Sequence, residues 1–121
     1  MKGTLILFQW QAEAAHQRAE ALAAAGWSVS IEAEDGGRGC KLVRDELPTV
    51  IVFDLAHRAS HSRISADALH SSKATRNLPM VFVDGSDEAI SKTRERVPGA
   101  LFTTSADLVE TLEQFAQMQQ V

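Results

Sequence analysis

The amino-acid sequence predicts an α/β fold, a doubly wound parallel sheet with helices on both of its faces. Short apolar runs of strand length alternate with stretches of helical periodicity, about five of each. Three of these runs are apolar at every position, which is typical of strands that are covered on both faces. Strands joined through helices lie parallel, and such crossover connections are right-handed.

The strands are expected in the order in which these runs occur. The run that ends at Asp54 is the best candidate for a central strand. The segment that begins at Trp27 alternates apolar and polar residues, so we expect it to be half-buried and nearer the sheet edge. The five predicted strands are 5–8, 27–33, 50–53, 80–83 and 100–102.

Helical periodicity fills the segments between the strands. The first helix is indicated by alanines and a leucine at helical spacing, and Gly26 follows it as a C-cap. A second helix runs from Cys40 to Leu47 and stops at Pro48. The third predicted helix has its apolar positions at Ala68 and Leu69, and the fourth has them at Ile90 and Val97. The last helix is apolar at Leu108, Leu112 and Phe115. It follows a capping box formed by Thr104 and Asp107.

Length and composition restrict the possible functions. The chain has 121 residues, 45% of them hydrophobic, which suits one domain spanning 1–121. No apolar run reaches the length of a membrane span, so we expect a cytoplasmic protein without a membrane partner. The net charge of −4 argues against nucleic-acid binding. The single cysteine, Cys40, is predicted to be a small core residue rather than a reactive thiol.

The fold class also predicts where a site would lie. Ligands of open parallel sheets bind beyond the carboxyl ends of the strands. The residues at those ends are Gln9 and Trp10, Asp54, Asp84, and Thr103 with Thr104.

From Thr4 to Phe115 the chain resembles the receiver domains of two-component response regulators. Four segments in the right order and spacing carry the resemblance, and they are 33–40 (AEDGGRGC), 48–54 (PTVIVFD), 78–83 (LPMVFV) and 98–100 (PGA). The resemblance implies a flavodoxin-like (CheY-like) sheet with strand order 2-1-3-4-5. It also implies that Asp54 is equivalent to the phosphorylated aspartate.

The chain departs from the receiver pattern at the other site positions. Receivers hold magnesium with an acidic pair, and here Gln9 and Trp10 occupy those positions. Receivers carry a hydroxyl residue after the fourth strand, and Asp84 replaces it here. They carry a lysine after the fifth strand, and Thr104 replaces it here. We therefore expect a degenerate site, a pseudo-receiver without bound cofactor or metal.

Two residues of this site have alternative interpretations. Asp54 is either still phosphorylated with the help of a partner kinase or caps the turn that follows its strand, and we favour the cap. If Asp54 and Asp84 lie close together, their repulsion should raise one apparent pKa. Trp10 is either a stacking platform for a ligand or, as we favour, a plug that fills the altered pocket.

A polar segment, 57–63 (HRASHSR), follows Asp54. Its Arg58, Ser60, Ser62 and Arg63, together with the N–H groups of the next helix, could bind a phosphate or nucleotide anion. An ordinary polar surface loop has the same composition, and this is the simpler interpretation.

The leading functional hypothesis is a non-enzymatic signalling module that binds a partner protein or a second copy of itself. No nucleophile elbow, Walker loop or GxGxxG motif indicates an enzyme. The resemblance places the partner surface on 86–97, 100–102 and 105–117, where basic and acidic side chains could pair across a two-fold axis. The alternatives are a small anion-binding domain and an ordinary phosphoacceptor receiver.

Overall fold

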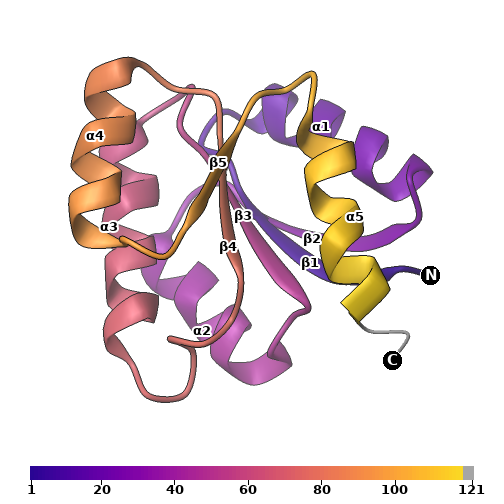
Figure 1. Ribbon diagram of the computed structural model, residues 1–121, viewed down its shortest axis with the longest axis horizontal. Coiled ribbons are helices and arrows are strands. Elements are labelled where there is room, and N and C mark those ends of the chain that lie inside the picture. The colour runs from indigo at the N-terminus through magenta and orange to yellow at the C-terminus, as the bar shows by residue number, and fades with distance from the viewer. Residues whose placement is uncertain (119–121) are drawn as a thin grey trace.

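The computed structural model describes residues 1–118 and confirms the predicted fold class. Five parallel strands form one sheet in the order β2-β1-β3-β4-β5, and a helix follows each strand (Figure 1). The strands are β1 (Gly3–Phe8), β2 (Trp27–Glu32), β3 (Val50–Asp54), β4 (Met80–Val83) and β5 (Leu101–Thr103). The helices are α1 (Ala12–Ala24), α2 (Gly36–Glu46), α3 (Ala59–Ser71), α4 (Asp87–Arg96) and α5 (Leu108–Met118).

The sheet lies between two helical layers. Helices α1 and α5 cover one face, and α2, α3 and α4 cover the other (Figure 1). Each layer has its own apolar cluster, with Leu22 and Leu112 on the first side and Val43 and Leu69 on the second. Burial of both faces explains why β1, β3 and β4 read as unbroken apolar runs.

The register aligns the carboxyl ends of the strands. Phe8 pairs with Glu32 and with Phe53, and Asp54 pairs with Val83. Strand β2 is at the sheet edge, as predicted, and its interior positions are only half-buried. The ends of β1, β3, β4 and β5 therefore meet along one rim, where the site was expected.

Several details differ from the sequence prediction. Helix α5 begins at Leu108, and the segment 105–107 before it is a turn. The predicted start at Thr104 is wrong, because the Thr104 carbonyl accepts the N–H of Asp107 at 3.1 Å and the helical bonding starts only at Asp107. Ala68 is exposed, and Ala66 and Leu69 are the buried apolar positions of α3. Cys40 is a core residue, as expected, and burial raises the pKa of its thiol.

Among residues 1–118, no helix combines the length and the hydrophobicity of a membrane-spanning segment.

Candidate functional site

Asp54 is the last residue of β3 and is fully buried, with 0% of its surface exposed. Its Oδ1 accepts the backbone N–H of Ala56 at 2.9 Å, which closes the turn after the strand. Its carbonyl oxygen accepts the hydroxyl of Ser62, in the first turn of α3, at 2.8 Å. The turn-capping contact that the sequence suggested for Asp54 is therefore present.

The second carboxylate oxygen of Asp54 is bound by an arginine from the other side of the sheet. Arg18, on α1, donates from Nε to Asp54 Oδ2 at 2.8 Å. Its Nη2 lies 3.3 Å from Asp84 Oδ2 and 3.1 Å from Ser105 Oγ. One guanidinium group thus contacts the carboxylates at the carboxyl ends of β3 and β4, and it neutralises part of their charge.

Asp84 follows β4 in a left-handed backbone conformation, with φ 60°. Ser105 donates its backbone N–H to Asp84 Oδ1 at 2.8 Å and its hydroxyl to Oδ2. Burial acts to raise the pKa of Asp84. The hydrogen bonds from Ser105 and the charge of Arg18 outweigh it, and the pKa lies below its ordinary value. Repulsion from Asp54 therefore does not raise the pKa of Asp84, because the Arg18 cation contacts both carboxylates.

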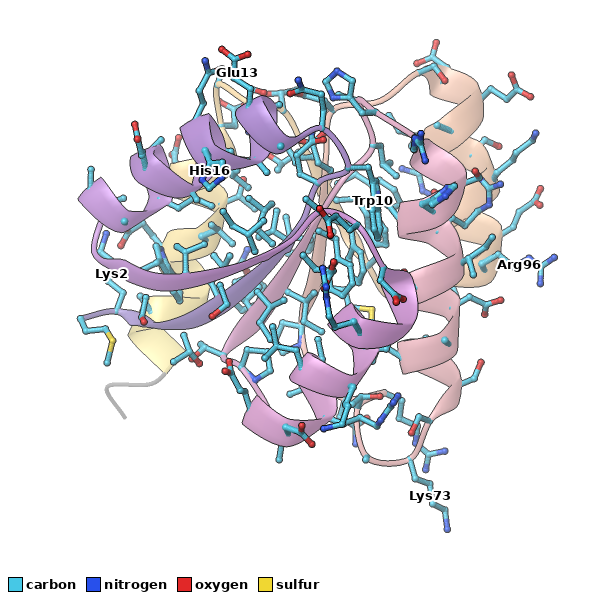
Figure 2. The ribbon with its side chains drawn as sticks, turned by 180° about the vertical axis from the view of Figure 1, so that it is seen from behind. Lys2, Trp10, Glu13, His16, Lys73 and Arg96 are labelled. Carbon is cyan, nitrogen blue, oxygen red and sulfur yellow. The ribbon has the colours of Figure 1, made fainter. Side chains whose placement is uncertain are left out.

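Gln9 and Trp10 make contacts within the protein. The Gln9 amide lies 3.2 Å from His57 Nδ1, and its Oε1 accepts the N–H of Gln11 at 2.8 Å. Trp10 is half-buried, donates from Nε1 to Ser62 Oγ at 2.9 Å and packs edge-on against His61. Figure 2 shows Trp10 above α2 and beside α3. Ser62 thus connects Trp10 to the Asp54 carbonyl, and the role of Trp10 as a plug stays a prediction.

Solved structures share this architecture over almost the whole chain. A CheY-like receiver domain protein from Methanospirillum hungatei JF-1 has a TM-score of 0.75 at 16% identity, covering 97% of this chain and 95% of its own. A sensor protein from Polaromonas sp. JS666 has a TM-score of 0.78 at 13% identity, covering 94% of this chain and 95% of its own. Chemotaxis protein CheY4 from Vibrio cholerae has a TM-score of 0.75 at 16% identity, covering 93% of this chain and 97% of its own.

The chain has the receiver-domain fold. No protein-family model and no curated protein matches it in sequence. The fold alone is therefore shared with receivers, and the chemistry of the site has to be argued from its own residues.

The residues at this rim do not fit the magnesium ion that receivers use. Mg²⁺ needs oxygen ligands in octahedral geometry, usually with carboxylates. Here Gln9 uses its amide internally, Trp10 offers no oxygen, and the Arg18 cation already contacts both Asp54 and Asp84. In residues 1–118 no group of three His, Cys, Asp or Glu side chains is placed to hold a metal.

The remaining predicted positions are only partly brought together. Thr104 lies at the surface, and Ser105 is the residue that contacts Asp84. In the segment after Asp54, Ser62 points inward, where its hydroxyl bonds the Asp54 carbonyl and the Trp10 indole, so it does not face a surface anion. Arg58 and Ser60 are exposed and Arg63 is half-buried, and anion binding by these three stays a prediction.

Arg18 and Ser105 are residues of the candidate site that the sequence analysis missed. A signal for Arg18 was available, because it lies three residues after Ala15 and four before Leu22, both fully buried. That spacing puts the arginine on the inward side of α1, where a cation needs a partner. Ser105 carried no comparable signal, since its place depends on how the segment between β5 and α5 turns.

Proposed function

We propose that this chain is a receiver-like signalling module that works without phosphorylation of Asp54 and acts through protein–protein contacts. The observation that supports this most directly is the position of Arg18. Its guanidinium binds Asp54 Oδ2 and lies within 3.3 Å of Asp84 Oδ2, so a cation of the chain itself neutralises the acidic site.

Phosphoryl transfer to an aspartate needs an oxygen that can reach the incoming phosphorus atom in line with the leaving group. Both carboxylate oxygens of Asp54 already accept hydrogen bonds, and the residue has no exposed surface. The lysine that would stabilise the transferred oxygens is replaced by the neutral Thr104, and Asp84 adds a carboxylate where receivers carry a hydroxyl residue. These features favour a site held permanently in one state over one that switches by phosphorylation.

A module of this kind would transmit its signal through its surface. We place the partner surface on α4, β5 and α5, where Leu101 and Val109 expose 39% and 38% of their surface. Arg94 lies over the Phe102 ring at 4.7 Å and presents a positive charge beside this apolar strip. The partner is a signalling protein or a second copy of the chain. A second copy is suitable because the same surface of both copies can pair across a two-fold axis.

The test uses acetyl phosphate with Mg²⁺ and the intact chain. We expect no mass increase of one phosphoryl group, and no chemical-shift change on adding beryllofluoride, in the native chain or in Asp54→Asn. The variant Arg18→Ala serves as a probe, because it removes the cation from Asp54 Oδ2 and substitutes no other residue of the site. Stoichiometric labelling of the native chain that disappears in Asp54→Asn would show that Asp54 is a working phosphoacceptor and refute the proposal.

A further inference from the structure

A hollow of about 330 Å³ lies between α2 and α3, on the opposite face of the sheet from α1. Gly36, Gly37, Cys40 and Arg44 line it from α2, and Ile64, Ser65 and Ala68 line it from α3. None of these residues belongs to the site around Asp54 or to the α4-β5-α5 strip. The two helices touch closely at Gly36, where an added Cβ would lie 2.7 Å from Ser65 Oγ.

The hollow has an exposed apolar wall, and a fixed aromatic ring lies near it. Ile64 exposes 67% of its surface, although it lies in the middle of α3. Packing within the chain gives no reason for isoleucine at such a position. Beyond Gly36 lies Trp10, whose ring is held by its hydrogen bond to Ser62. Fixed tryptophans and exposed aliphatic side chains around a hollow are typical of binding surfaces, because they contribute contact area at little entropic cost.

The charge at the hollow indicates what binds there. Two other cations of α2 are paired within the chain, Arg38 with Glu32 at 2.8 Å and Lys41 with Asp45 at 2.6 Å. Arg44 is the only charged residue lining the hollow, and it has no ion pair among the residues that the structure describes. A cation beside an apolar hollow is complementary to a carboxylate beside an apolar side chain.

We infer that the α2–α3 hollow docks an acidic amphipathic segment of a partner protein. An apolar side chain of that segment enters between Ile64 and Ala68, and a neighbouring Asp or Glu pairs with Arg44. Gly37 has no side chain, which lets the backbone of the segment approach α2 closely. This surface is additional to the proposed α4-β5-α5 strip, and neither depends on the other.

The experiment selects 16-residue peptides from a random displayed library on the intact native chain, with counter-selection on Ile64→Asp. Selected peptides are then synthesised without tryptophan and titrated while Trp10 fluorescence is followed, with buried Trp27 as the constant background. We expect the selected sequences to combine carboxylates with apolar residues at helical spacing. Amide chemical shifts should move at Gly37, Ile64 and Ala68.

Reversing the charge of Arg44 tests whether the hollow prefers acidic peptides. Arg44→Glu should weaken an acidic peptide about tenfold or more, the amount expected for one charge-assisted contact, and a peptide with Lys in place of its carboxylate should regain affinity. Lys41→Glu is the control, because it reverses a charge on the same helix away from the hollow, and it also breaks the pair with Asp45. Both positions are exposed, so folding is expected to survive.

Three results would overturn the inference. One is a selection that yields no peptide dependent on Ile64. Another is affinity that responds equally to Arg44→Glu and Lys41→Glu. The third is self-association of the native chain that is lost in Ile64→Ser, which would make the occupant a second copy. The acetyl phosphate experiment is unaffected by any of these, so the two proposals can fail separately.

Discussion

Two strands of this sheet end in buried carboxylates that are bound by arginines, and the two pairs are built differently. Glu32, at the end of β2, accepts Nε and Nη2 of Arg38 at 2.8 Å each and also accepts two backbone N–H groups. Asp54, at the end of β3, accepts one backbone N–H and Nε of Arg18. Arg38 is six residues from its partner, whereas Arg18 is 36 residues away.

The difference in sequence separation gives the two pairs different roles. The Glu32 pair holds one turn and the start of α2 at the sheet edge. Close packing of Gly39 supports the same turn, because a Cβ there would lie 2.4 Å from the Phe8 ring. The Arg18 cluster joins α1, β3, the turn after β4 and the segment before α5. A local pair thus stabilises one connection, and a long-range pair fixes the relative positions of the elements that surround the receiver site.

Removing Arg18 should have the largest effect. The Arg18 side chain is 17% exposed and that of Asp54 is 1% exposed, so Arg18→Ala leaves a buried carboxylate without its cation. We expect the free energy of unfolding to fall by about 3–5 kcal/mol, measured by urea denaturation. The Arg38→Ala variant should lower the free energy of unfolding by less, because the Arg38 side chain is 60% exposed and water screens its pair with Glu32.

A double variant separates the charge from the packing. Arg18→Met with Asp54→Asn removes the buried charge and keeps most of the side-chain volume, so it should recover most of the lost stability. Equal costs for Arg18→Ala and Arg38→Ala would show that the long-range pair is no more important than the local one.

Acidification should weaken the local pair. Burial acts to raise the pKa of Glu32, but hydrogen bonds from Arg38 and the backbone lower it from 4.5 to about 2. A lowered pKa in the folded state means that the pair's contribution is fully present above pH 4.5 and is lost as the pH falls toward 2. We expect Glu32→Gln to remove about 1–2 kcal/mol of this acid-dependent stability after allowance for solvent screening.

Urea denaturation at pH 6 and at pH 3 gives the measurement. The native chain should lose more stability between the two values than Glu32→Gln does. Some dependence should remain in the variant, because the pKa of Asp84 is also lowered in the folded state. If the free energy of unfolding depends on pH identically in both chains, the Glu32–Arg38 pair is not a source of the acid-dependent stability.

The fold was predictable from the sequence because its signals are local and repeated. Leu5–Phe8 and Met80–Val83 are apolar at every position, and only a sheet covered on both faces buries such runs. The edge position of β2 followed from its alternating pattern. The start of α5 could not be found in this way, because Thr104 and Asp107 satisfy a capping pattern while a turn over 105–107 delays the helix.

The site was predictable only in part, for a physical reason. Topology placed Asp54 and Asp84 on one rim, but the residue that connects them comes from α1. The helical spacing of Arg18 indicates that it faces inward, but no local pattern identifies a partner 36 residues away. The orientation of Ser62 is a similar case. Its neighbours suggested a polar surface loop, and the helical turn instead directs its hydroxyl to the Asp54 carbonyl.

The smallest stability effect, and the sharpest test of the proposed partner surface, concerns Arg94. The structure shows that Arg96 lies 3.5 Å from Asp67 and that Glu113 pairs with Lys2, so both are engaged within the chain. Arg94 and Glu110 are exposed, and they are the better choice for charge reversal. Arg94→Glu also loses the contact with the Phe102 ring, which costs about 0.5–1 kcal/mol of stability.

If the chain self-associates through α4, β5 and α5, Arg94 of one copy faces an acidic side chain of α5 in the other. Arg94→Glu should then weaken the dimer about fivefold in sedimentation equilibrium, the value of a partly exposed ion pair, and adding Glu110→Lys should restore it. Arg94→Gln is the control that removes the ring contact without reversing the charge, so it should weaken the dimer less. A native chain that stays monomeric at millimolar concentration would exclude the second copy and leave a separate signalling protein as the partner, because the apolar strip at Leu101 and Val109 would still need a complementary surface.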